Sequence, residues 1–280
     1  MNKIKLRSML EQFFVEDIGE RDISTDLIFG NVERGEISFI AKEDGLFCGE
    51  EVISVGFEIL SKENQVEQFV HDGMPFNKGD ILAKVTGKIA DLLTGERVVL
   101  NLVQRMCGVA TMTKRAVSQL NSSHTRICDT RKTTPGLRML EKYAVRIGGG
   151  FNHRIGLYDG VMIKDNHITF AGSITEAVTK ARAGLGHMVK IEVETETLEQ
   201  VREAINAGAD VIMFDNRTPQ EITEWIKIVP DTIITEASGG ITMENIASYS
   251  ETGVDYISLG FLTHSAKAVD ISVKVSIAAC

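Results

Sequence analysis

The sequence predicts an α/β protein whose second half forms a parallel (β/α) barrel, complete or open. From about residue 125 to 265, short β-branched runs alternate with helical patterns. From IEVE onward the repeat is roughly 22 residues, which suits βα units with parallel strands. Nearly every expected strand also ends in a polar residue or a glycine pair. No GxGxxG follows the first of these strands, so a dinucleotide-binding fold is not favoured.

The elements of this half follow from the same runs. We expect strands within TRICDT, GVMIKD, MVKIEVE, DVIMFD, TIITEAS and DYISLG, and helices within SITEAVTKARAGL, TLEQVREAINAG and TPQEITEWIKIV. The first 120 residues differ, with one helix, a β-rich middle and a second helix. In the middle, Gly-bounded runs such as RGEISFIAKEDGLFCGEEVI and VEQFVHDGMPFNKGDILAKVTG are typical of antiparallel strands. From about Ile89, apolar residues recur every three to four positions and predict a long helix.

Composition narrows the class of protein. A chain of 280 residues, 43% hydrophobic and 25% charged, suits one large barrel or two soluble domains. The N-terminal residues lack the features of a signal peptide, and no window approaches the ~20 apolar residues of a membrane span, so we expect a cytoplasmic protein. Cys48, Cys107, Cys128 and Cys280 are scattered and predict reduced thiols. A net charge of −9 argues against nucleic-acid binding.

The barrel hypothesis places the chemistry at the carboxyl ends of the strands. Those ends carry Arg131-Lys132, Lys164-Asp165, Glu192 and Glu194, Asp215-Asn216, Ser238-Gly239-Gly240, and Gly260. A purely structural barrel has no reason to place such groups at so many strand ends. We therefore expect one polar site there.

A basic segment indicates that the site binds anions. Between Arg126 and His167 the chain has eight Lys or Arg and four Asp or Glu, although the whole protein is acidic. The alternative is a solvated surface. Arg131 and Lys132 are neighbours in an extended chain, so their side chains point in opposite directions and need not serve one ligand. Gly148 to Gly150, just before His153 and Arg154, would let the backbone approach a ligand closely.

Acidic residues and glycines complete the predicted site. Lys190, Glu192 and Glu194 alternate and so share one face of their strand, with Glu194 nearest its end. Glu194 and Asp215 suit Mg²⁺ or ribose hydroxyls, and the alternative is internal salt bridges to Lys190 or Lys164. Loops such as Ser238-Gly239-Gly240 can bind phosphate through backbone N–H groups.

The longest motifs resemble one protein family. DTRKTTPGLRMLEKYAV and GGGFNHRIGLYDGVMIKDNH, with EDIGERDISTD, GERVVLNLVQRMCGVAT, IEVE, MFDN, EASGG and GVDYISLGFLTHS, resemble the quinolinate phosphoribosyltransferases, or carboxylating nicotinate-nucleotide pyrophosphorylases. The resemblance covers nearly the whole chain. It implies an N-terminal α/β sandwich over residues 1–110 and, over residues 111–265, the open barrel of type II phosphoribosyltransferases with fewer than eight strands. The tail 266–280 could pack with the first domain.

The resemblance also implies an activity. Quinolinate and phosphoribosyl pyrophosphate would give nicotinate mononucleotide, pyrophosphate and CO₂, with Mg²⁺ as cofactor, in NAD biosynthesis. The protein would be a homodimer with active sites shared between subunits, and further assembly stays open. One departure from the family is Cys107, where a serine is expected; we expect it to affect packing only.

The resemblance assigns roles residue by residue. Quinolinate would be bound by Arg131, His153, Arg154 and Lys164, with Arg97 contributed by the partner subunit. Phosphoribosyl pyrophosphate would be bound by Lys132, Lys164, Glu194 and Asp215, and its 5′-phosphate by Ser238, Gly239, Gly240 and Gly260. Mg²⁺ would lie at Glu194 and Asp215, directly or through the substrate. The catalytic residues would be Lys164, Glu194 and Asp215.

Three alternatives remain at this point. Lys164 could form a Schiff base, as in barrel aldolases, although that requires a desolvated amine rather than a cluster of cations. The chain could be a paralogue that acts on another anionic base, for example one tied to molybdenum transport. It could also be a non-catalytic protein that kept an anion pocket.

Overall fold

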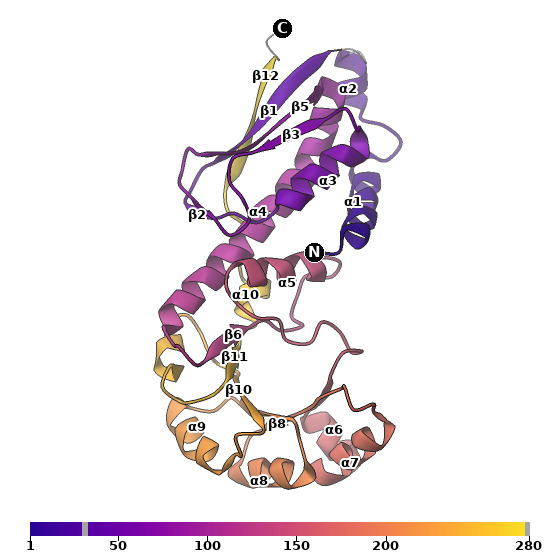
Figure 1. The fold of residues 1–280 in the computed structure, drawn as a ribbon. Coiled ribbons are helices and arrows are strands. Elements are labelled where there is room, and N and C mark those ends of the chain that lie inside the picture. The colour runs from indigo at the N-terminus through magenta and orange to yellow at the C-terminus, as the bar shows by residue number, and fades with distance from the viewer. Residues whose placement is uncertain (30–32, 278–280) are drawn as a thin grey trace. The chain divides into compact units, whose positions relative to one another are not determined.

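The computed structural model describes residues 1–29 and 33–277. The chain divides into two compact units. The first comprises Met1–Met112, Met139–Gly148 and Ala266–Cys280, and the second comprises Thr113–Arg138 and Gly149–Ser265. Figure 1 labels their elements, and each unit is described by itself.

The first unit contains helices packed with an antiparallel sheet of strand order β12-β1-β5-β3. On β1 every second residue is buried, so Ile37 and Phe39 enter the core, where Phe39 meets Phe57 of helix α3 edge to face. Helix α4 (Ile89–Leu120) contains the division between the two units. The other elements of the first unit are α1 (Lys3–Ile18), α2 (Ile23–Ile28), β1 (Arg34–Ala41), β2 (Gly45–Leu46), α3 (Glu50–Leu60), β3 (Gln65–Gln68), β4 (Pro75–Phe76), β5 (Ile81–Lys88), α5 (Arg138–Ile147) and β12 (Ile271–Ile277).

One expectation for the β-rich middle was wrong. Residues Glu50 to Ile53 were expected to lie in an antiparallel strand region, but they form the first turn of helix α3. Gly49, the residue before this helix, has no side chain that could cap it. Instead Asp72 accepts hydrogen bonds from the backbone N–H groups of Gly49 and Glu50. The cap therefore comes from a residue distant in sequence, so the usual local start signal is absent.

The second unit is a six-stranded parallel sheet of order β6-β11-β10-β9-β8-β7. It confirms the fold class expected for this half, an α/β barrel with fewer than eight strands. The strands are β6 (Arg126–Cys128), β7 (Val161–Ile163), β8 (Ile191–Thr195), β9 (Val211–Asp215), β10 (Ile234–Ser238) and β11 (Tyr256–Ser258). All six lie within the segments predicted for them, except that β8 extends one residue further, to Thr195.

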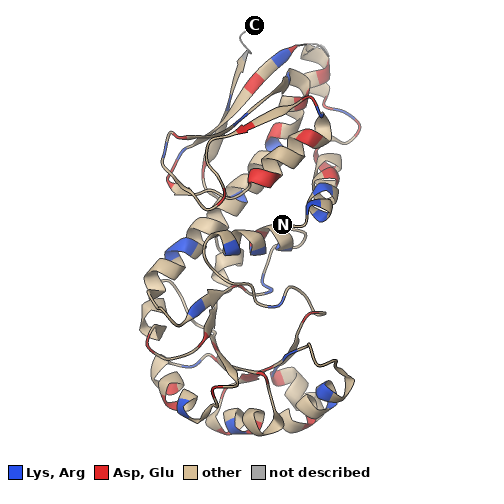
Figure 2. Ribbon diagram, viewed as in Figure 1, with Lys and Arg blue, Asp and Glu red and all other residues tan. Residues whose placement is uncertain are grey.

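Helices lie outside this sheet (Figure 1). They are α6 (Asp165–Ala171), α7 (Ile174–Gly184), α8 (Leu198–Ala207), α9 (Pro219–Trp225) and α10 (Phe261–His264), with 3₁₀ turns at Ile226–Ile228 and Ile246–Tyr249. The predicted helices correspond to α7, α8 and α9, although α9 ends earlier and continues as a 3₁₀ turn. Lys and Arg mix with Asp and Glu on these outer helices (Figure 2), as on a solvated surface.

Two further expectations concern the whole chain. Among the described residues, no helix has both the length and the apolar character needed to cross a membrane. Cys48, Cys107 and Cys128 are buried and form no disulfide among the described residues, and Cys280 lies outside those residues. Cys107 packs against the backbone of Cys48, and burial raises its pKa to about 12. It therefore behaves as a packed thiol.

Candidate active site

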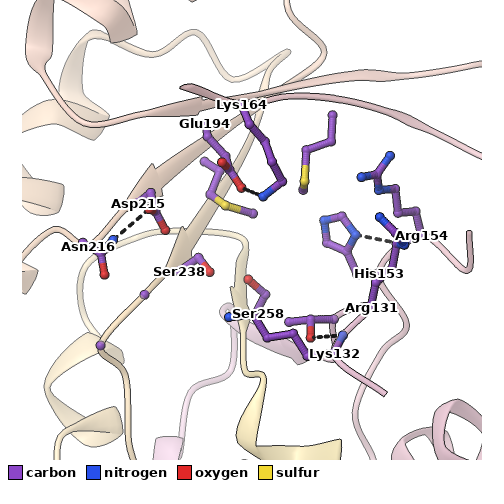
Figure 3. A pocket seen from close by; sticks show the side chains of 15 residues that line it. Arg131, Lys132, His153, Arg154, Lys164, Glu194, Asp215, Asn216, Ser238 and Ser258 are labelled. Carbon is purple, nitrogen blue, oxygen red and sulfur yellow. Dashed lines mark hydrogen bonds and ion pairs between the residues drawn. The ribbon is translucent and has the colours of Figure 1, made fainter. Parts of the chain in front are cut away.

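A cavity of about 600 Å³ lies at the carboxyl ends of the barrel strands (Figure 3). Most of the predicted site residues line it: Arg131, Lys132, His153, Arg154, Lys164, Glu194, Asp215, Ser238, Gly239 and Gly240. In Figure 3, Arg131, His153 and Arg154 gather on one side, and Asp215, Asn216 and Ser238 on the opposite side. The cavity thus has a cationic end and an end rich in oxygen groups and glycines.

Arg131 and Arg154 form the cationic end. The Nε of Arg131 is buried without a hydrogen-bond partner within the described protein. The guanidinium of Arg154 donates to the carbonyl of Gly160 at 3.0 Å. Burial, and then the positive charge of Arg131, lower the pKa of Arg154. An anion between the two arginines would neutralise their positive charges. It would also accept a hydrogen bond from the unused Nε of Arg131.

Two loops carry these arginines, and Asp129 joins them. Its fully buried carboxylate accepts from Asn152 Nδ2 at 2.6 Å and from the backbone N–H of His153 at 2.9 Å. Arg138 braces the first loop by donating to Thr133 Oγ1 at 2.9 Å. Sequence reasoning did not single out Asp129. The only sequence signal for Asp129 was its position, as an acid at a strand end. In the structure its hydrogen bonds connect the two loops, and it is not among the residues that line the cavity.

Arg131 and Lys132 both line the cavity, and the chain bends at Arg131 instead of staying extended there. A Cβ added to Gly260 would lie 3.1 Å from Lys132 Cδ, so the lysine stem runs beside the end of β11. The backbone carbonyl of Lys132 accepts from Thr263 Oγ1 at 2.7 Å. Gly260 itself is not among the lining residues. Gly260 lies next to the Lys132 side chain, and the absence of a side chain at Gly260 leaves room for that lysine.

Lys164 and Glu194 stand at the ends of neighbouring strands and form an ion pair. The salt bridge expected as an alternative is thus present for Glu194, and both of its side chains also line the cavity. The pKa of Glu194 is raised, chiefly by burial, with the negative charges of Asp215 and Glu192 adding to the effect and Lys164 opposing it. Asp215 accepts from Asn216 Nδ2 at 2.8 Å. Both carboxylates face the cavity, and oxygen donors of this kind fit Mg²⁺.

The loop Ser238-Gly239-Gly240 closes the end opposite the arginines. Gly239 has φ 82°, and a Cβ there would lie 2.2 Å from Asn216 Oδ1 and 2.8 Å from Asn216 N. The backbone N–H of Asn216 donates to the Ser238 carbonyl at 2.8 Å. Glycine is thus needed at position 239 for both conformation and space.

The imidazole of His153 lies next to two buried acids on barrel strands, Glu192 and Glu236. Its Nε2 lies 2.9 Å from Glu192 Oε2 and 3.7 Å from Glu236 Oε1, and its Nδ1 accepts from the backbone N–H of Arg154 at 2.8 Å. Burial, and then the charge of Glu192, raise the pKa of Glu236 to about 8. Glu192 was noted in the sequence at a strand end and in an alternating set, without a role, and Glu236 was missed.

Other lining residues were also missed, namely Thr130, Met162, Met213 and Ser258, whereas Asn216 was noted only as a group at a strand end. Alternation could have found three of them. Met162, Met213 and Ser258 each precede a predicted site residue by two positions, so they share its side of the strand. The two methionines give the otherwise polar cavity an apolar wall.

Part of the basic segment lies elsewhere. Lys142 and Arg146 are on α5, in the first unit, and Arg126 stacks on the ring of Phe151. Gly148 to Gly150 follow the end of α5, where Gly149 has φ 90°, and none of them lines the cavity. Their expected approach to a ligand is therefore not seen, since helix termination accounts for Gly149. Arg97 is on α4 in the first unit, with its side chain 62% exposed.

Comparison with known proteins defines the class. The family models for the quinolinate phosphoribosyl transferase N-terminal and C-terminal domains match residues 22–107 and 109–274. The chain is a phosphoribosyltransferase by fold and by family, and it belongs to the quinolinate phosphoribosyl transferase family.

Individual relatives agree along the full length. The chain is 56% identical to a probable carboxylating nicotinate-nucleotide pyrophosphorylase of Bacillus subtilis, over 99% of this chain and 96% of the relative. It is 42% identical to one of Synechocystis, over 95% and 91%. Among solved structures, NadC from Streptococcus pyogenes superposes with a TM-score of 0.95 at 38% identity, over 100% of this chain and 99% of that one.

Proposed function

We propose that the barrel cavity is where this chain joins quinolinate to phosphoribosyl pyrophosphate. The activity is that of a carboxylating nicotinate-nucleotide pyrophosphorylase, which converts quinolinate to nicotinate mononucleotide in NAD biosynthesis. The observation that carries the assignment of the cavity is the buried, unpartnered Nε of Arg131 beside Arg154. A planar dicarboxylate suits two guanidinium groups, each of which can bind a carboxylate through parallel hydrogen bonds.

The two ends of the cavity would serve different substrates. Quinolinate would lie at Arg131 and Arg154, with its ring against the thioethers of Met162 and Met213. The phosphoribosyl donor would lie across Lys132, Glu194 and Asp215, with its 5′-phosphate at Ser238, Gly239 and Gly240. This division follows the cationic end of the cavity and its end with acidic residues and glycines. It holds two mutually repelling anions within reacting distance.

The chemistry needs charge stabilisation more than proton transfer. When pyrophosphate leaves, the ribose C1 becomes electron-poor, and the carboxylates of Glu194 and Asp215 would stabilise that charge. The pyridine nitrogen then bonds to C1. Loss of the 2-carboxylate as CO₂ leaves its electron pair on the ring carbon, and Lys164 would stabilise it until a proton arrives. Because Lys164 is paired with Glu194, it differs from the desolvated amine that a Schiff base requires.

We propose Mg²⁺ as the cofactor, because Glu194 and Asp215 offer carboxylate oxygens at neighbouring strand ends. When bound, the ion would neutralise the charge of the pyrophosphate leaving group. Asn216 holds the Asp215 carboxylate in place through its hydrogen bond. Lys164 would keep Glu194 oriented in the same way.

The assembly and location are further proposals. We propose domains at residues 1–110 and 111–265, with the tail 266–280 joining the first, and a homodimer in which Arg97 of the partner subunit completes the quinolinate end. The exposure of Arg97 is compatible with such a contact. The buried thiols of Cys48, Cys107 and Cys128 are compatible with the cytoplasm.

Release of labelled CO₂ tests the reaction directly. Purified protein with Mg²⁺, phosphoribosyl pyrophosphate and quinolinate labelled in the 2-carboxylate should release label and form nicotinate mononucleotide in equal amounts. Omitting phosphoribosyl pyrophosphate is the control, and it should abolish both products. Absence of label release from folded protein would rule out the activity and favour a paralogue or an anion-binding protein.

A further inference from the structure

The side chain of Thr263 is fully buried and hydrogen-bonds to a residue that lies 131 positions away in the sequence. Its Oγ1 donates to the backbone carbonyl of Lys132 at 2.7 Å. Thr263 is on the short helix α10, which follows β11, whereas Lys132 is in the loop that follows β6. The bond therefore joins the segments after two neighbouring strands, and one of these segments carries a residue proposed to bind phosphoribosyl pyrophosphate.

A purely local role for this hydroxyl is the alternative, because a threonine within a helix often bonds only to its own preceding turn. Thr263 Oγ1 lies 3.2 Å from the carbonyl oxygen of Gly260, three residues earlier. That carbonyl already accepts from the backbone N–H groups of Thr263 and His264, at 3.2 and 3.1 Å. The bond to Lys132 is shorter, at 2.7 Å, which is the usual length of an O–H···O hydrogen bond. The geometry therefore assigns the hydroxyl proton to the Lys132 carbonyl.

The loop that carries Lys132 needs such a contact. Residues 129–137 contain neither helix nor strand, so the sheet does not fix their backbone. Within this loop the N–H of Thr133 donates to the carbonyl of Arg131 at 2.8 Å, so Lys132 is at the centre of a tight turn. Bonds from outside the turn must set where it lies.

Two threonine hydroxyls hold the backbone of Lys132. Thr130 Oγ1 accepts from the N–H of Lys132 at 3.0 Å, and Thr263 Oγ1 donates to its carbonyl. Thr130 belongs to the same loop, whereas Thr263 belongs to another element. The bond from Thr263 therefore fixes the turn relative to the end of β11. A lysine binds anions as a point charge on a flexible stem, so the position of its backbone limits which phosphate oxygens its amine can reach.

We propose that Thr263 is a positioning residue, whose hydroxyl fixes the turn at Lys132 so that the lysine amine reaches phosphoribosyl pyrophosphate. The inference rests on the proposed role of Lys132 at that end of the cavity. Thr263 is not among the described residues that line the cavity. It therefore acts through Lys132 rather than on the substrate.

Thr252 provides a matched control. It is also buried, at 3% exposure, and its Oγ1 donates to the backbone carbonyl of Tyr249 at 2.8 Å. However, Thr252 precedes β11 and so lies towards the amino end of that strand, whereas the cavity is at the carboxyl end. The two threonines thus share burial and a bond to a carbonyl but differ in their connection to the site.

Binding of phosphoribosyl pyrophosphate with Mg²⁺ to full-length variants, measured by calorimetry, tests the proposal. Thr263→Val keeps the shape but removes the donor, and it should weaken this binding about five- to tenfold, as expected for loss of one hydrogen bond. Thr263→Ser keeps the hydroxyl and should retain most of the affinity. Thr252→Val should bind like the wild type, although its melting temperature falls. Quinolinate binding, at the other end of the cavity, should be unchanged in all three variants.

A double-mutant cycle tests whether Thr263 acts through Lys132. Lys132→Ala should weaken binding of phosphoribosyl pyrophosphate about tenfold or more, and adding Thr263→Val to it should weaken binding no further. Effects that add would mean that Thr263 acts independently of the lysine, and would overturn the proposal. Wild-type affinity in Lys132→Ala would instead refute the proposed role of Lys132, and the inference with it, so the two failures are distinguishable.

Three other outcomes would overturn the proposal: wild-type affinity in Thr263→Val, a loss in Thr263→Ser as large as in Thr263→Val, or an equal loss in Thr252→Val. Thr263→Cys covers the case in which Thr263→Val does not fold, because a thiol is a weaker donor of similar size. It should weaken binding of phosphoribosyl pyrophosphate about threefold and leave quinolinate binding unchanged. Wild-type affinity for phosphoribosyl pyrophosphate in Thr263→Cys, or an equal loss for both substrates, would contradict the inference.

Discussion

Lys164 and Glu194 form an ion pair across the ends of strands β7 and β8. The parallel register places them together, since Met162 is paired with Glu192 and Ile163 with Val193, one position earlier. This pair lies between the cationic end of the cavity and the end with Asp215 and Ser238 (Figure 3). Lys164 is therefore placed to act on both substrates.

Replacing Lys164 should impair catalysis more than folding. In Lys164→Ala the electron pair left by CO₂ loses its stabilising cation, and kcat should fall about 100-fold or more. Steady-state kinetics measure this change. Lys227→Ala removes a lysine from a solvent-exposed pair with Glu224 and should retain wild-type kcat. Similar kinetics for the two variants would contradict the assignment of Lys164.

Replacing Arg131 should affect quinolinate specifically. Each charge-assisted hydrogen bond is worth about 1.5–3 kcal/mol, so Arg131→Ala should lower kcat/KM for quinolinate about 10- to 100-fold. The KM for phosphoribosyl pyrophosphate should change little. Arg182→Ala, which removes an exposed pair with Asp210, is the control. An equal rise in both KM values would argue against separate ends for the two substrates.

Two neighbouring glycines should differ in their tolerance of alanine. Both Gly239 and Gly240 have positive φ, which costs alanine about 1–2 kcal/mol. Only at Gly239 would the new Cβ overlap Asn216, whereas Gly240 has open space around it. Gly239→Ala should therefore lower the melting temperature more and raise the KM for phosphoribosyl pyrophosphate more. Equal effects would show that packing against Asn216 does not matter.

Glu236 should make stability depend on pH. Its pKa of about 8 in the folded protein exceeds the usual 4.5, so the folded state keeps a proton that the unfolded state loses. The resulting stability is complete below pH 4.5 and is lost as the pH rises through about 8. His153, Glu192 and Glu194 are the charged or titratable groups that influence it. Glu236→Gln should flatten the loss of stability between pH 5 and 8.

Denaturant unfolding at several pH values measures this slope. Glu221→Gln is the control, because hydrogen bonds from Thr218 lower the pKa of Glu221, and its contribution is lost only as the pH falls below about 4.5. That variant should keep the wild-type slope between pH 5 and 8. An unchanged slope in Glu236→Gln would contradict the prediction.

Shared active sites can be tested by mixing inactive subunits. Arg97→Ala and Lys164→Ala should each be inactive or nearly so. After mixing and reassociation, a mixed dimer would pair an intact barrel with an intact Arg97 at one site, and activity should return in part. Mass measured by light scattering checks the dimer. Persistent inactivity despite a dimeric mass would argue that Arg97 does not serve the partner's site.

The sequence by itself determined the fold class and most of the cavity lining. Short β-branched runs ending in polar residues located the six strands, and parallel strands bring their carboxyl ends to one edge, so Lys164, Glu194 and Asp215 meet there. These predictions succeed because alternation and strand ends are local properties of the chain.

The tertiary structure decided what depends on contacts between distant residues. Helix α3 was hidden because its cap, Asp72, lies more than twenty positions away. Glycines 148–150 end a helix rather than approach a ligand, and Gly260 makes room for Lys132. The orientation of the His153 ring depends on Glu192, which is 39 residues distant in sequence, although its Oε2 lies only 2.9 Å from His153 Nε2. Such hydrogen bonds fix protonation and orientation, and no local pattern encodes them.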